Sequence, residues 1–173
     1  MLHPTFRRAF IGLGSNLAHP RRQLARAIAA LAREPGCRVV QRSPNYLSAP
    51  VGCTQPQPDF VNAVVAMATT RSPRALLAAL LAIERHQHRR RDPGGGRNTP
   101  RTLDLDLLLY GRRQLRSATL TVPHPRMHGR AFVLRPLADI APGVVVPRRG
   151  LARRLLHGLA DQRIARTPAY VLR

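Results

Sequence analysis

The sequence contains no lysine and no tryptophan, and only eight of its 173 residues are acidic. All 29 basic residues are therefore arginine, and the formal net charge is +21. Heavy use of Gly, Ala, Pro and Leu beside arginine is typical of coding bias in a GC-rich genome. A pI near 12 still attracts polyanions, which makes nucleic-acid binding one class to consider. Aromatic residues make up only 4% of the chain, and no RNA-binding aromatic motif or zinc finger is present, so that class is disfavoured.

Cysteine and long apolar runs are also scarce. Cys37 and Cys53 are the only cysteines, and their spacing fits no zinc pattern, so we expect them to be reduced. No apolar run approaches the roughly 20 residues of a membrane span, and the apolar stretch after the basic N-terminus is too short for a signal peptide. We therefore expect a cytoplasmic protein with no membrane partner. The length and a hydrophobic content of 44% suit a single domain over residues 1–173.

The densest chemical signal lies in residues 100–110, where Asp104 and Asp106 stand in an apolar run typical of a β-strand. Successive side chains of a strand alternate between faces, so the two carboxylates share one face about 6–7 Å apart. Neighbouring carboxylates repel each other when buried, and the pair needs a counter-charge. Arginine could supply it, with Arg101 as the nearest candidate, or a hard cation such as Mg²⁺, which also holds substrate phosphates. Spacing alone leaves these two alternatives equal.

An arginine- and glycine-rich segment, residues 89–99, comes just before this strand. It includes Arg89, Arg91 and the run Gly94-Gly95-Gly96. Guanidinium groups suit phosphate oxygens and glycines allow a loop to close, so the segment could be a lid over a polyphosphate. The alternative is a flexible surface loop. Its position directly before the carboxylates favours the lid, and the lid favours a metal and phosphate site.

Hydrophobic periodicity predicts the order β-α-β-β-α-β as far as Tyr110. The expected elements are a strand over 10–17, a helix over 20–33, strands over 37–47 and 59–67, a helix over 73–88 and the carboxylate strand. This order is the ferredoxin-like α+β pattern, an antiparallel sheet with helices on one face and the other face free for ligands. A C-terminal helical and strand extension follows, with helices over 129–137 and 151–159 and strands over 144–146 and 169–172.

Other segments indicate a binding pocket. The strand over 59–67 carries Phe60 and Asn62 on one face, where the amide could read the edge of a heterocycle or simply bond loop backbone. The proline-rich loop before it, residues 48–58, is too long for a hairpin turn, which indicates a role at a site. His124 lies between two prolines and could bind a phosphate or be structural.

Taken together, these motifs resemble the 6-hydroxymethyl-7,8-dihydropterin pyrophosphokinase family of folate biosynthesis, from Gly14 to about Pro142. The most specific segments are Pro58-Asp59-Phe60-Val61-Asn62-Ala63, Pro100-Arg101-Thr102-Leu103-Asp104-Leu105-Asp106 and Val122-Pro123-His124-Pro125-Arg126-Met127. The resemblance implies a transferase that moves pyrophosphate from ATP to the hydroxymethyl group of the pterin and leaves AMP. We expect one pyrophosphokinase domain acting as a monomer, with no specific nucleic-acid partner. The alternative is a basic nucleic-acid-binding domain on the same fold with lost or weakened catalysis.

The resemblance also implies roles for individual residues. Two Mg²⁺ ions would bind at Asp104 and Asp106, and the catalytic arginines would be Arg89, Arg91 and Arg101. Those arginines would contact ATP together with Thr121, His124 and Arg130. The pterin would lie between Phe60 and Phe132, with Asn62 reading its edge and Ser48, Ala49, Pro50 and Val51 lining the pocket.

The chain departs from the family pattern close to the carboxylates. Arg97-Asn98-Thr99-Pro100-Arg101 stands where the family usually has Arg-Trp-Gly-Pro-Arg, at the end of a longer loop. Thr119 stands where an arginine is common. We therefore expect altered lid closure and a reduced ATP affinity or reaction rate, while the metal and pterin residues are complete.

Overall fold

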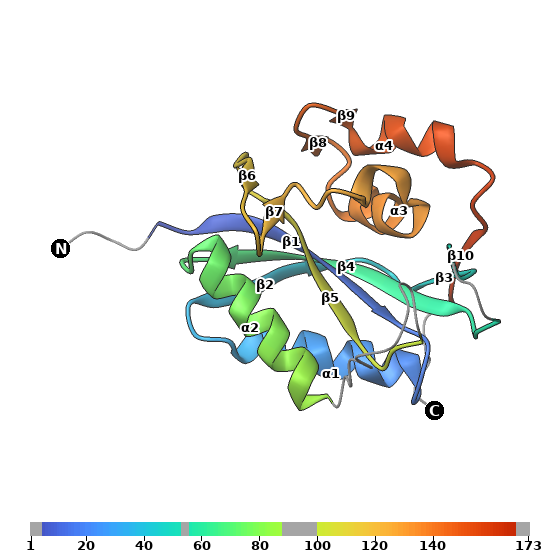
Figure 1. The fold of residues 1–173 in the computed structure, drawn as a ribbon, viewed down its shortest axis with the longest axis horizontal. Helices are drawn as coiled ribbons and strands as arrows, with labels where there is room; N and C mark the ends of the chain where they lie inside the picture. The colour runs from blue at the N-terminus through green and yellow to red at the C-terminus, as the bar shows by residue number, and fades with distance from the viewer. Residues whose placement is uncertain (1–4, 53–55, 88–99, 169–173) are drawn as a thin grey trace.

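The computed structural model of the chain describes residues 5–52, 56–87 and 100–168. An antiparallel sheet forms the centre of these described parts (Figure 1). Its strands are β1 (Arg7–Ser15), β2 (Cys37–Arg42), β3 (Tyr46–Ser48), β4 (Phe60–Thr69), β5 (Asp104–Tyr110) and β10 (Ile164–Arg166). The strand order is β10-β3-β4-β1-β5, and β2 also pairs with β4. The predicted ferredoxin-like α+β order is confirmed.

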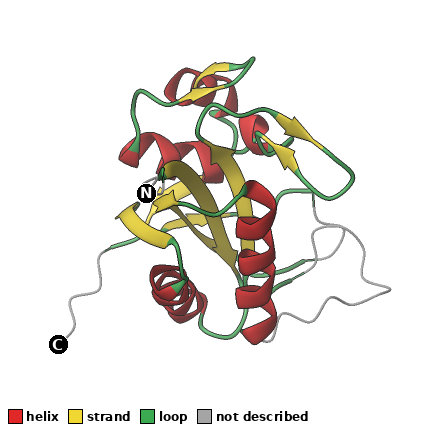
Figure 2. Cartoon of the chain, turned by 90° about the vertical axis from the view of Figure 1, so that its left-hand side faces the viewer, coloured by secondary structure: helices red, strands yellow, loops and turns green. Residues whose placement is uncertain are grey.

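Two helices, α1 (Pro20–Arg33) and α2 (Pro73–His86), cover one face of the sheet (Figures 1 and 2). Both begin with proline in the first turn, a position where the missing N–H costs no helical bond. Ser72 caps α2, because its hydroxyl accepts a hydrogen bond from the Ala75 N–H at 3.2 Å. Buried leucines of both helices, including Leu24 and Leu80, pack with the sheet residues of this face into one core.

The C-terminal extension packs against the opposite face of the sheet (Figure 1). The hairpin of β6 (Leu115–Arg116) and β7 (Thr121–Val122) instead adds Leu115 and Val122 to the first core. The extension contains the short strands β8 (Val145–Val146) and β9 (Gly150–Leu151). Its helices are η1 (Met127–Gly129), α3 (Ala131–Ile140), α4 (Ala152–Leu155) and η2 (Leu156–Leu159). Leu134 and Leu137 of α3 form a second core with Val64 and Leu108. The C-terminal extension therefore covers part of the face opposite α1 and α2, because outward residues of β4 and β5 are apolar here.

Several element boundaries differ from the prediction, among them β1, which was expected over 10–17 and runs over Arg7–Ser15. The strand expected over 37–47 is two strands, since Pro44 has no N–H and Ser43 instead bonds Val64 through both its backbone N–H and its hydroxyl. The helix expected over 129–137 begins at Ala131 and ends at Ile140, and the helix over 151–159 is α4 followed by a 3₁₀ turn. The strand expected over 169–172 lies outside the described residues. No helix in the described ranges is long and apolar enough to cross a membrane.

Candidate active site

The two glycines of β1 align the candidate residues of three strands. Gly14 is paired with Asp104 on one side and with Asn62 on the other, and Gly12 is paired with Asp106. Opposite residues of antiparallel strands point to the same face, so Asp104, Gly14 and Asn62 form a row across the sheet. A Cβ atom at Gly14 would lie 3.3 Å from Asn62 Oδ1. The glycines therefore keep the floor between the carboxylates and the amide open.

A cavity of ≈ 880 Å³ lies above this floor, a volume ordinary for a small-molecule site. Of the predicted site residues, it is lined by Ser48, Ala49, Val51, Phe60, Asn62, Arg101, Asp104, Asp106, Arg130 and Phe132. The structure thus brings both aspartates, two of the predicted ATP contacts (Arg101 and Arg130) and most of the predicted pterin residues into one space. Among the described residues, Pro50, Thr121 and His124 do not line it, although His124 approaches Asp106. Arg89 and Arg91 lie outside the described residues.

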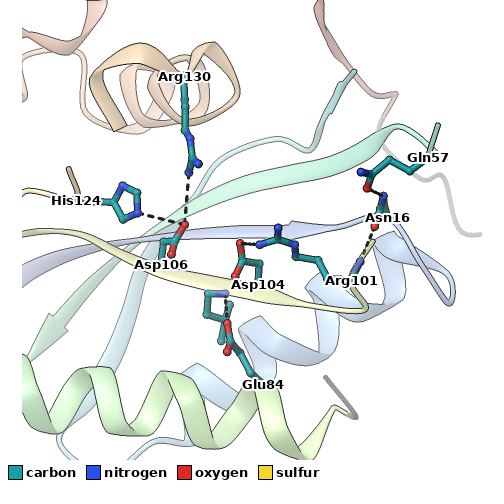
Figure 3. Close-up of polar contacts among 9 residues, drawn as sticks. Asn16, Gln57, Glu84, Arg101, Asp104, Asp106, His124 and Arg130 are labelled. Atoms are coloured by element: carbon teal, nitrogen blue, oxygen red, sulfur yellow. Dashed lines mark hydrogen bonds and ion pairs between the residues drawn. The ribbon is translucent and has the colours of Figure 1, made fainter. Parts of the chain in front are cut away.

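The two carboxylates have different surroundings, which Figure 3 shows. Asp104 Oδ2 accepts a hydrogen bond from Arg101 Nη1 at 2.6 Å, a tight ion pair. Asp106 Oδ2 lies 3.8 Å from His124 Nε2 and 3.9 Å from Arg130 Nη1, distances too long for direct hydrogen bonds. The arginine and metal alternatives are therefore not exclusive: Asp104 has an arginine partner, and Asp106 retains room for a further ligand.

Burial, and next the Asp104 carboxylate, raise the pKa of Asp106 from 3.8 to about 6. The ionised form of such a carboxylate is stabilised when a cation binds nearby. No group of three or more His, Cys, Asp or Glu in the described ranges could hold a metal. Two carboxylates suit Mg²⁺, which keeps several waters and takes substrate phosphate oxygens as its other ligands. The donor set present therefore fits Mg²⁺ delivered with a nucleotide.

His124, although it does not line the cavity, directs a neutral N–H toward Asp106. Its Nδ1 accepts a hydrogen bond from the Arg126 backbone N–H at 3.3 Å, so the ring proton resides on Nε2. Burial, and next the positive charges of Arg130 and Arg126, lower the pKa of His124 to about 4. At neutral pH the ring is thus an uncharged donor directed at Asp106, able to hydrogen-bond a phosphate oxygen.

The opposite side of the cavity carries the amide and the aromatic rings. Asn62 is 4% exposed, and its Nδ2 donates to Ser48 Oγ at 2.9 Å and to the Phe60 carbonyl at 3.4 Å. The second bond is long, so Ser48 is the main partner of the amide. The Arg130 guanidinium carbon lies 5.4 Å from the centre of the Phe132 ring, a cation–π distance that joins the arginine to the aromatic wall.

Two buried polar residues at or beside the site, Asn16 and Glu84, belong to none of the predicted ligand sets. Asn16 is 3% exposed; its Nδ2 donates to Gln57 Oε1 at 2.9 Å, and its Oδ1 accepts from the Arg101 N–H at 2.9 Å (Figure 3). It joins the segments that lead into β4 and β5. Glu84 Oε1 accepts from the Leu105 N–H at 2.7 Å and fixes β5 between the two aspartates. The sequence signals for these two residues were the position of Asn16 directly after Gly-x-Gly-Ser and the position of Glu84 as the one acidic residue of its helix.

The chain is similar to known proteins over most of its length. Residues 10–142 match the family model described as 7,8-dihydro-6-hydroxymethylpterin-pyrophosphokinase. A curated 2-amino-4-hydroxy-6-hydroxymethyldihydropteridine pyrophosphokinase from Pseudomonas aeruginosa is 47% identical, over 93% of this chain and 97% of that protein. The protein of the same name from Haemophilus influenzae is 42% identical, over 90% of this chain and 95% of that one.

Solved structures support the fold. A crystal structure of Plasmodium falciparum HPPK-DHPS with pteroate has a TM-score of 0.72 and 12% identity, covering 93% of this chain. This chain spans 44% of that longer protein. The match over residues 10–142 and the identities to curated bacterial proteins show that the chain belongs to the 7,8-dihydro-6-hydroxymethylpterin-pyrophosphokinase family.

Proposed function

We propose that the protein transfers pyrophosphate from ATP to the hydroxymethyl oxygen of 6-hydroxymethyl-7,8-dihydropterin, giving the pterin diphosphate and AMP in folate biosynthesis. The observation that carries this proposal is the row of Asp104, Gly14 and Asn62 across the sheet. It places a carboxylate pair and an amide beside an aromatic wall in one cavity. Two substrates bound at the two ends of that row would meet above the glycine.

On the nucleotide side, Asp104 and Asp106 are the proposed ligands of two Mg²⁺ ions that accompany ATP. When bound, such ions neutralise the charge of the transferring group. Arg101, Arg130 and the His124 Nε2–H supply the remaining positive charge and hydrogen-bond donors around the triphosphate. Arg101 is already hydrogen-bonded to Asp104, and the His124 and Arg130 nitrogens already lie within 4 Å of Asp106, so little reorganisation is needed when the phosphates enter.

On the pterin side, Phe60 and Phe132 are the proposed stacking partners of a flat heterocycle. Asn62 is the proposed reader of its edge, because the buried amide is fixed by Ser48 and a directed polar group beside an aromatic wall suits a polar ring. The segment that includes Ser48, Ala49, Pro50 and Val51 closes this end. Pyrophosphoryl transfer in such a site proceeds by positioning and charge neutralisation, without a covalent enzyme intermediate.

The test is AMP release from ATP, with and without the dihydropterin and with and without Mg²⁺. We expect AMP only when both are present. Asp104→Ala and Asp106→Ala should each abolish it, whereas Asp161→Ala, an exposed acid, should not. Full activity of either site variant would refute the assignment of the metal ligands. Salt-dependent RNA binding by a protein that forms no AMP would favour the nucleic-acid alternative.

A further inference from the structure

The segment from Gln162 to Thr167, here called the C-terminal strap, lies beyond residues 10–142 that match the family model. It follows η2 and descends from the C-terminal extension to the sheet, where β10 runs beside β3 (Figure 1). The strap thus connects the layer that carries α3 with the strand that carries Ser48. Both of these elements contribute walls of the cavity.

Gln162 holds the backbone on both sides of Arg130. Its Oε1 accepts a hydrogen bond from the Ala131 N–H at 2.9 Å, and its Nε2 donates to the Gly129 carbonyl at 2.9 Å. The Ala131 N–H is one of the first-turn donors that a helix leaves unpaired. Arg130, the residue at the N-cap of α3, makes no side-chain cap bond. A glutamine 31 residues away therefore caps α3 and frees the Arg130 side chain to face the cavity.

The residues that follow fix Gln162 to the other side of the site. Ile164 pairs with Ser48 in the sheet, and the Thr167 N–H donates to the Asn45 carbonyl at 2.9 Å. Arg163 lies 3.2 Å from Asp59, directly before β4, but its side chain is 74% exposed, so this ion pair adds little. The sheet pairing is therefore the main anchor of the strap.

Arg130 and Phe132 both depend on the backbone that Gln162 holds. Arg130 Nη1 lies 3.9 Å from Asp106 Oδ2, and its guanidinium stacks near the Phe132 ring. A rotation of the first turn of α3 would move the arginine on the phosphate side and the ring on the pterin side together. Among the described hydrogen bonds, the two from Gln162 are the ones that reach the backbone of residues 129–132 from outside η1, its N-cap Arg126 and α3.

We propose that Gln162 is a positioning residue for the transfer reaction, which sets Arg130 and Phe132 relative to Asp106 and the β4 wall. This inference rests on the proposed function. It predicts that loss of the two Gln162 bonds weakens use of both substrates at once, because one backbone turn carries one contact to each. Displacement of a positioning group typically lowers the rate on the order of 10-fold to 100-fold.

The experiment compares Gln162→Ala and Gln162→Glu with Gln114→Ala, which removes an exposed glutamine of the turn after β5. Gln162→Glu keeps an acceptor for the Ala131 N–H, so α3 stays capped, but it loses the donor to the Gly129 carbonyl. Steady-state AMP formation gives kcat and both KM values at 25 °C. Pterin fluorescence gives pterin affinity, and thermal melts report folding.

We expect kcat/KM to fall about 10-fold or more for both substrates in Gln162→Ala and less in Gln162→Glu, with pterin affinity reduced in both. Gln114→Ala should match the wild type. The inference is overturned if both Gln162 variants stay within twofold of Gln114→Ala, or if their losses disappear when each is assayed equally far below its own Tm. An inactive wild type would refute the proposed function instead, which separates the two failures.

Discussion

Replacing Asp106 with asparagine should stabilise the metal-free protein while abolishing its activity. Burial and the nearby Asp104 carboxylate raise the pKa of Asp106 from 3.8 to about 6. Because the pKa in the folded protein is above its ordinary value, folding favours the protonated form. The stability that the protonated Asp106 contributes to the folded protein is fully present below pH 3.8, and it is lost as the pH rises through about 6. At pH 8 the ionised carboxylate therefore costs stability.

The size of the effect follows from that difference in pKa. It corresponds to about 3 kcal/mol for a fully desolvated group. The Asp106 side chain is 34% exposed, and solvent screening over that area reduces the expected gain to about 1 kcal/mol. Asparagine has nearly the same shape and carries no charge, so it should recover this amount at pH 8.

Urea unfolding of the metal-free protein in a chelator at pH 8 and near pH 4 measures the gain. Asp106→Asn should raise the free energy of unfolding at pH 8, and the difference should shrink toward pH 4. Asp161→Asn, at an exposed position, should change it by less than about 0.5 kcal/mol at either pH. A destabilised Asp106→Asn at pH 8, or a gain that is independent of pH, would refute the electrostatic reasoning.

Three further substitutions test the surroundings of the site. Gly14→Ala should raise the KM for the pterin several-fold with little change in Tm, because the new Cβ would lie 3.3 Å from Asn62 Oδ1; an unchanged KM would mean that the floor tolerates a methyl group. Glu84→Ala should lower the free energy of unfolding in urea by about 2 kcal/mol, since the buried Leu105 N–H loses its acceptor. Tyr46→Phe removes the hydrogen bond from the Tyr46 hydroxyl on β3 to the Asp139 carboxylate on α3. This change should lower the free energy of unfolding by about 1 kcal/mol, and no loss would show that the bond contributes nothing.

The sequence predicted those parts of the fold that depend on local pattern. The α1 bounds and the strand with two aspartates follow from periodicity and alternation within one segment. The family resemblance then brought Asp104 and Asn62 into one site. For the helix and the strand, the deciding interactions lie within a few residues of each other along the chain.

The remainder depends on contacts between distant segments. The pairing of Gly14 with both Asp104 and Asn62 is a matter of register between three strands, which no single segment encodes. Gln162 caps α3 from 31 residues away, so the sequence around Ala131 contains no signal for this cap. Packing of α3 on the second face likewise follows from apolar outward residues of β4 and β5, whose partner could not be identified before the chain was folded.

The most direct measurement of the central claim follows the β-phosphate of ATP. With ATP labelled at the β-phosphorus, Mg²⁺ and 6-hydroxymethyl-7,8-dihydropterin, the label should appear in the pterin diphosphate, with one unlabelled AMP formed for each. Both outer phosphates move together only if the pterin hydroxyl attacks the β-phosphorus, so that the bond from that phosphorus to the α,β-bridging oxygen breaks and AMP leaves. Label recovered in ADP, or ATP cleavage that does not need the pterin, would contradict the account.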